Sequence, residues 1–144
     1  MIREATKEDV KALTLLMSEL GYPTTEEKMT IRFKRIKSQS NYQTYVYEKD
    51  SRLVGMVGMF EAIRYESDDS YIRIVTMVVD SKFRGLGIGK ELLIAAERWA
   101  LERGASMISL NSGNREERQQ AHEFYRHQGF KGTATGFYKK IKDA

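Results

Sequence analysis

The residues whose types and spacing point most directly to chemistry form a glycine-rich turn. They read Arg84-Gly85-Leu86-Gly87-Ile88-Gly89-Lys90. The β-branched segment before them, residues 71–79, predicts a buried strand. Apolar residues after them recur at helical spacing until Gly104, a typical residue for the end of a helix. Such a strand-to-helix turn presents backbone N–H groups and a helix dipole that attract phosphate, although a tight connection alone would also need small residues.

The spacing of these glycines excludes two common nucleotide-binding motifs. A P-loop needs Gly-x-x-x-x-Gly-Lys followed by Ser or Thr. Here Arg84 stands at the first glycine position, and Glu91 follows Lys90. A dinucleotide fingerprint needs Gly-x-Gly-x-x-Gly, and its third glycine would fall at Lys90 or at Leu92. A phosphate ligand of this turn would therefore bind through neither a P-loop nor a dinucleotide fingerprint.

Arg84, Gly87 and Gly89 do fit the pattern Arg-x-x-Gly-x-Gly. In its strand–turn–helix setting this pattern resembles the pyrophosphate loop of the GNAT superfamily of acyl-CoA-dependent N-acyltransferases. That loop reads Gln/Arg-x-x-Gly-x-Gly/Ala between the fourth strand and the helix after it. The resemblance implies that acetyl-CoA is the cosubstrate and that backbone N–H groups across residues 84 to 90 bind its pyrophosphate.

A second segment carries the same resemblance. Residues 118–128 predict a helix that ends at Gly129, and Ala121 to Phe130 are similar to the family signature Ala-x-x-Phe-Tyr-x-x-x-Gly-Phe. In relatives, the tyrosine that matches Tyr125 protonates or hydrogen-bonds the departing thiolate. The resemblance therefore implies a catalytic role for Tyr125, and the competing interpretation is an ordinary core aromatic.

The resemblance also assigns a role to the end of the strand at 71–79. Pantetheine would lie along this strand where it parts from the next one. Main-chain groups of Met77, Val78 and Val79 would then bind the pantetheine amides and help to polarise the thioester carbonyl. Relatives often place an asparagine against pantetheine, and Asn111 is the candidate here, with loop capping as the alternative.

The general base is where the chain departs from the family pattern. Many relatives carry glutamates at the positions occupied here by Val75 and Thr76. A protonated amine must nevertheless lose a proton before it attacks a thioester. Three routes stay open: Glu61 at the end of the preceding strand, a water relay through Thr76 or Tyr71, or no dedicated base.

Composition narrows the function classes. The chain has 144 residues, with 41% hydrophobic and 31% charged residues, as expected of one globular domain spanning residues 1–144. No apolar run approaches the roughly 20 residues that span a membrane, and no signal peptide opens the chain, so a cytoplasmic location is expected. Cysteine is absent, and the two histidines, His122 and His127, lack the spacing of a metal pair, so no metal site is expected.

The net charge of +4 does not indicate nucleic-acid binding. Basic and acidic residues are interleaved, and the basic tail at residues 139–142 lacks interspersed aromatic residues of a nucleic-acid platform. The mild positive field favours an anionic ligand such as CoA.

Hydrophobic periodicity and turn residues predict the order β-α-α-β-β-β-α-β-α-β. The predicted segments are 2–5, 10–20, 25–37 (with Thr24 or Thr25 as the cap), 43–48, 52–60, 71–79, 90–103, 106–110, 118–128 and 132–141. This order predicts an α/β (α+β) fold with a mixed, mostly antiparallel sheet flanked by helices, and it matches the GNAT arrangement along the whole chain. Exposed sheet edges favour a homodimer.

The leading functional hypothesis is acetyl transfer from acetyl-CoA directly to a primary amine of a small molecule. The segment Leu20 to Pro23 and the signature around Tyr125 look like the branch that includes aminoalkylphosphonate N-acetyltransferases. Asp68 and Asp69 would instead attract a polycation. The alternatives are a protein or peptide N-acetyltransferase and a catalytically weak CoA-binding sensor module. An anionic group on the amine would bind one of four arginines: Arg32, Arg35, Arg64 and Arg73.

Overall fold

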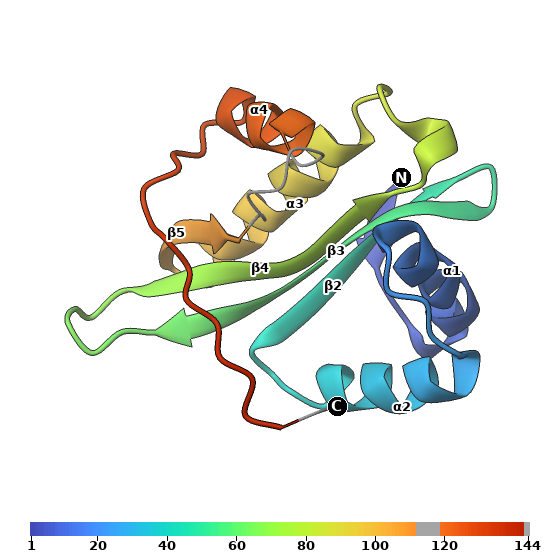
Figure 1. Ribbon diagram of the computed structural model, residues 1–144, viewed down its shortest axis with the longest axis horizontal. Coiled ribbons are helices and arrows are strands. Elements are labelled where there is room, and N and C mark those ends of the chain that lie inside the picture. The colour runs from blue at the N-terminus through green and yellow to red at the C-terminus, as the bar shows by residue number, and fades with distance from the viewer. Residues whose placement is uncertain (112–118, 143–144) are drawn as a thin grey trace. The chain divides into compact units, whose positions relative to one another are not determined.

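A computed structural model of the protein describes residues 1–111 and 119–142 (Figure 1). Its contacts divide the chain into two compact units, Met1–Leu110 and Asn111–Ala144. The second unit contains α4 (Gln119–His127). The first unit contains β1 (Ile2–Glu4), η1 (Lys7–Asp9), α1 (Val10–Leu20), α2 (Glu26–Lys37), β2 (Tyr42–Lys49), β3 (Arg52–Ile63), β4 (Ser70–Val79), η2 (Ser81–Phe83), α3 (Ile88–Glu102) and β5 (Ala105–Leu110).

The strands form one five-stranded sheet in the order β1-β2-β3-β4-β5. The first four strands are antiparallel neighbours, whereas β4 and β5 run parallel. A parallel pair needs a crossover connection, and α3 supplies it. The predicted mixed, mostly antiparallel sheet flanked by helices is therefore confirmed.

Two helix ends follow the capping rules that their residues predict. Thr25, rather than Thr24, is the N-cap of α2, and its side chain accepts a hydrogen bond from the Lys28 N–H. Gly21 ends α1 in the left-handed conformation (φ 101°), which a residue without a Cβ adopts without strain. These caps fix the turn that joins α1 to α2.

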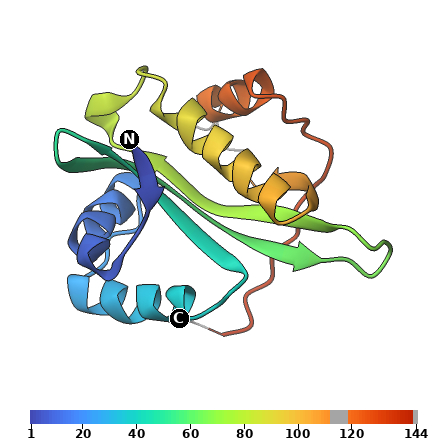
Figure 2. The same cartoon turned by 180° about the vertical axis from the view of Figure 1, so that it is seen from behind.

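The two faces of the sheet are covered by different helices. Figures 1 and 2 show α1 and α2 on one face and α3 on the other. The core beneath α1 and α2 joins their apolar residues to Val46, Met56 and Val78 of the sheet. On the opposite face, an added Cβ at Gly55 would lie 3.1 Å from Ile88 and 3.2 Å from Leu92. Gly55 thus allows the first turns of α3 to pack closely on β3.

The strand predicted at residues 132–141 is wrong, because residues 131–142 form no strand. Their large apolar side chains are exposed: Phe137 (91%), Tyr138 (80%) and Ile141 (88%). Two of these are adjacent in sequence, so the segment lacks the strict alternation that buries one face of a strand. Gly132 and Gly136 further weaken any strand here.

Candidate active site

The parallel strand β5 ends beside the middle of β4. Their pairing ends at Ile74↔Leu110, whereas β4 continues to Val79. From Val75 onward, β4 pairs with β3 on one edge and with no described strand on the other. Met77, Val78 and Val79, predicted to bind pantetheine, therefore lie on a stretch whose outer edge no strand of residues 1–111 or 119–142 covers.

A β-bulge marks the same point. Gly58 of β3 pairs with Thr76, and the next residue, Met59, pairs with Ile74, so Val75 is an extra residue without a partner on β3. The Val75 side chain is 58% exposed. Bulges re-aim side chains and often lie next to active sites. The sequence contains one weak signal for this bulge, the isolated Gly58 within a strand pattern. In the structure, a Cβ at Gly58 would approach the Thr76 methyl group to 2.9 Å, so a larger residue would have to displace it.

The glycine-rich turn lies directly beyond the end of β4. Gly85 (φ 80°) and Gly87 (φ 82°) are both in the left-handed conformation, which favours glycine. A Cβ at either position would meet no atom within 4 Å, so the turn is open in front of both residues. The Arg84 Nε donates a hydrogen bond to the Val79 carbonyl (3.3 Å), which holds the start of the turn against the strand.

The N-terminus of α3 is open as well. Gly87 is the N-cap and provides no side-chain hydrogen bond, and the helix begins at Ile88 rather than at the predicted Lys90. The Glu91 N–H donates to the Gly87 carbonyl (3.1 Å), so the amides of the turn before Glu91 lie ahead of the helical ladder. An open turn, a helix N-terminus and these amides together fit an anionic pyrophosphate.

The connection between β4 and the turn is tied to its surroundings. Asp80 donates its N–H to the Val54 carbonyl (2.8 Å), and its carboxylate accepts from the Lys82 N–H (3.0 Å). Glu19 of α1 accepts hydrogen bonds from the N–H (2.9 Å) and the hydroxyl (2.7 Å) of Ser81. These bonds lower the pKa of Glu19 and anchor the end of α1 beside the end of β4.

Glu61 lies on β3 opposite Ile72, nearer the start of β4 than the bulge. Its carboxylate accepts hydrogen bonds from the Ser70 hydroxyl (2.6 Å) and from Nε of Arg103 (2.8 Å), just after α3. The bond from Ser70 and then the guanidinium of Arg103 lower the pKa of Glu61. Both effects weaken a carboxylate as a base. Its predicted catalytic role stays a prediction.

In the second unit, Tyr125 lies on α4, and its ring makes edge contacts with Phe124 (5.5 Å) and Phe130 (5.9 Å). Asn111 donates a hydrogen bond to the Tyr138 hydroxyl (2.6 Å). The predicted start of this helix, Arg118, lies outside the described residues. The roles of Tyr125 and Asn111 therefore stay predictions.

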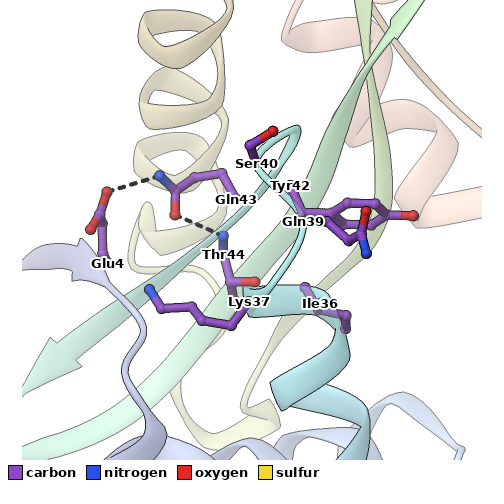
Figure 3. Close-up of a pocket in the computed structure, with 8 residues that line it drawn as sticks. All are labelled: Glu4, Ile36, Lys37, Gln39, Ser40, Tyr42, Gln43 and Thr44. Atoms are coloured by element: carbon purple, nitrogen blue, oxygen red, sulfur yellow. Dashed lines mark hydrogen bonds between the residues drawn. The ribbon is translucent and has the colours of Figure 1, made fainter.

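Two hollows lie on the side of the sheet that carries α1 and α2. One, of about 190 Å³, is lined by residues from the end of β1, the end of α2 and the start of β2 (Figure 3). Figure 3 shows Gln43 linking Glu4 to the backbone of Thr44, with the ring of Tyr42 pointing away from them. The other is wider, about 870 Å³, and is lined by the α1–α2 turn together with Lys28 and Arg32.

Within residues 1–111 and 119–142, no three acidic or histidine side chains gather as a metal site would require. Over the same ranges, no helix combines the length and apolarity needed to cross a membrane.

Comparisons with known proteins agree with this geometry. The family model described as "Acetyltransferase (GNAT) family" matches residues 10–130. The aminoalkylphosphonate N-acetyltransferase of Salmonella typhimurium is 26% identical over 145 residues, an alignment that covers 97% of this chain and 90% of that protein. A GNAT family acetyltransferase of Staphylococcus aureus is 30% identical, with 98% of each chain covered and a TM-score of 0.85. An aminoglycoside N-acetyltransferase in complex with CoA shares the fold (TM-score 0.85, 18% identity, 99% and 95% coverage).

The chain therefore belongs to the GNAT family of acetyltransferases. Its class of activity is acyl-CoA-dependent N-acetyl transfer, and the cosubstrate of this family is acetyl-CoA.

Proposed function

We propose that this protein transfers the acetyl group of acetyl-CoA directly to a primary amine of a small molecule. The observation that carries the proposal is that β4 continues beyond the end of β5 at Ile74↔Leu110, with a bulge at Val75 and an open glycine turn after the strand. It supplies main-chain groups along β4 and backbone amides at a helix N-terminus, the two features that a pantetheine chain and a pyrophosphate need. The Salmonella relative, named for aminoalkylphosphonates, supports a small acceptor.

Backbone amides across Arg84, Gly85, Leu86, Gly87, Ile88, Gly89 and Lys90 would bind the pyrophosphate. The main chain of Met77, Val78 and Val79 would bind pantetheine along the open edge of β4, with Asn111 as a further contact. When bound, acetyl-CoA supplies an acetyl thioester that an amine can attack.

The remaining tasks are proton transfers. Thr76 lies at the bulge, and its buried hydroxyl has no hydrogen-bond partner. A water held by this hydroxyl would relay the proton of the amine to bulk solvent, a route that does not require Glu61, whose carboxylate is already engaged by Arg103. Tyr125 would donate a proton or a hydrogen bond to the departing thiolate. The cytoplasmic location and the homodimer stay predictions.

A thiol-release assay with acetyl-CoA tests this function. Small primary amines and peptides with free N-termini or lysines would be compared at equal concentration. Release stimulated by small amines is expected. Rapid acetylation of peptides but not of small amines would instead support a protein acetyltransferase, and no stimulation by any amine would support a non-catalytic CoA-binding module.

A further inference from the structure

The sheet face that carries α1 and α2 is only partly covered by them. The core beneath these helices includes Val46, Met56 and Val78. A neighbouring row of four side chains does not belong to that core: Tyr42, Phe60, Arg73 and Ser109. Strand pairing places the row straight across the sheet, as Tyr42↔Phe60, Phe60↔Arg73 and Arg73↔Ser109.

Alternation along β3 fixes the face to which this row belongs. Phe60 points to the same side as Gly58 and Met56, because residues two apart in a strand share a face. Met56 packs into the core beneath α1 and α2. The row therefore lies on that face, where all four of its residues are half-buried.

Two buried hydroxyl oxygens on this face have no hydrogen-bond partner. They belong to Thr76, at the bulge, and Ser109, the neighbour of Arg73 on β5. Thr76 faces the same way as Phe60, because its methyl group approaches the Cβ position of Gly58. Buried hydroxyls normally have partners, so two orphaned ones on the face that carries Arg73 indicate a place where a polar ligand completes the bonding.

An apolar wall adjoins these polar groups. The rings of Tyr42 and Phe60 are stacked, with centroids 5.3 Å apart. Tyr42, at the β2 end of the row, also lines the smaller hollow at the end of α2 (Figure 3). A short alkyl chain would contact these rings while its polar group lies over Arg73.

The four arginines that the sequence offers for an anionic group lie on different elements. Arg32 and Arg35 are exposed on α2. Arg64 lies over the ring of Tyr71 (4.6 Å) and 3.9 Å from Asp69, beyond the end of β3. Arg73 alone of the four lies on β4, three residues before Thr76.

We propose that Arg73 determines the specificity of the acceptor by binding an oxyanion, a phosphonate, phosphate or carboxylate, on a small primary amine. This inference rests on the function proposed above. Three residues of a strand span about 10 Å, so the guanidinium and the bulge would together contact the two ends of one short molecule. Arginine suits this role because its planar fork pairs with two oxygens at once. The Tyr42–Phe60 wall would contact the carbons between the amine and the acid.

The test measures kcat/KM by thiol release for three amines of similar size: 2-aminoethylphosphonate, β-alanine and the uncharged-tail control n-propylamine. Spermidine is added as a polycation. The proteins are the native chain, Arg73→Met, Arg73→Lys and Arg98→Met, the last removing an exposed arginine of α3 as a matched control. Calorimetric titration with acetyl-CoA is run on all four proteins.

The native protein should prefer the acids over n-propylamine, and the favoured acid identifies the oxyanion. Arg73→Met should lower this preference by about 10- to 100-fold, as expected for charge-assisted hydrogen bonds. Acetyl-CoA binding and turnover of n-propylamine should change little. Arg73→Lys should fall between, because the charge remains but the fork is lost. Arg98→Met should keep the native preference.

An unchanged preference in a folded Arg73→Met or Arg73→Lys protein would overturn the inference while leaving the proposed function intact. A native preference for spermidine or n-propylamine would do the same. Failure of the native protein to bind acetyl-CoA would instead overturn the proposed function, and the inference with it.

Discussion

A single carboxylate in the glycine turn should abolish tight binding of acetyl-CoA without unfolding the protein. Gly87→Glu introduces it where φ is 82° and no atom lies within 4 Å of the new Cβ. Gly104→Glu is a matched control beyond the other end of α3, with φ 75° and the same open space. The left-handed conformation costs a non-glycine residue about 1–2 kcal/mol at either site. The helix dipole favours the negative charge near its N-terminus, so Gly87→Glu should be the more stable variant.

The loss of affinity follows from Coulomb's law. A carboxylate about 5 Å from one phosphate charge, at an effective dielectric constant of about 20, costs about 3 kcal/mol. The dissociation constant for acetyl-CoA should therefore rise by about 100-fold. Raised salt should reduce this difference between Gly87→Glu and the native protein. Gly87→Ala has the same backbone strain without the charge, so its affinity should fall by less than about 10-fold.

Isothermal titration with acetyl-CoA measures these affinities, and thermal denaturation confirms that each variant is folded. The expected order is native, then Gly104→Glu close to native, then Gly87→Ala, with Gly87→Glu far weaker. Equal binding by Gly87→Glu and the native protein would refute the assignment of the pyrophosphate to this turn. Equal losses in Gly87→Glu and Gly104→Glu would show that strain, and not charge, is responsible.

Three further predictions test how the site is built. Gly55→Val should destabilise the fold by about 1–3 kcal/mol and weaken acetyl-CoA binding, because the valine side chain would collide with Ile88 and Leu92. Denaturant unfolding would measure the stability and calorimetry the affinity. Native-like values for both would contradict the close packing of α3 on β3. Glu61→Gln should leave kcat within about 3-fold and cost at most about 1 kcal/mol of stability. Because the pKa of Glu61 is lowered, that stability is present above its unfolded pKa of about 4.3 and is lost as the pH falls through the folded pKa; the native protein and the variant should therefore converge in acid melting curves. A fall in kcat of several tens-fold at unchanged acetyl-CoA affinity would instead establish Glu61 as the base. Tyr125→Phe should lower kcat by about 100-fold with acetyl-CoA affinity unchanged, while Tyr65→Phe, a change in an exposed hairpin residue, should have no effect; equal turnover in the two variants would exclude Tyr125 from leaving-group chemistry.

Short-range rules accounted for most of the elements. Hydrophobic periodicity predicted β2, β3, β4, β5, α1, α2 and α3 within a few residues, because each of these segments must bury one face. The strand predicted at residues 132–141 is absent because apolar and polar residues do not alternate along that segment. Only pairing with a neighbouring strand would have stabilised a strand there.

The sequence by itself determined the glycine turn and the start of a helix after it, since left-handed backbone and an open N-cap depend on neighbouring residues alone. Only the tertiary structure decided where the pairing of β4 with β5 ends, that Val75 forms a bulge, and that Glu61 is bound by Arg103, 42 residues away. It also placed Arg73 in one row with Tyr42 and Phe60. Strand register and ion pairs join residues far apart in the chain, and no local pattern encodes which partners meet.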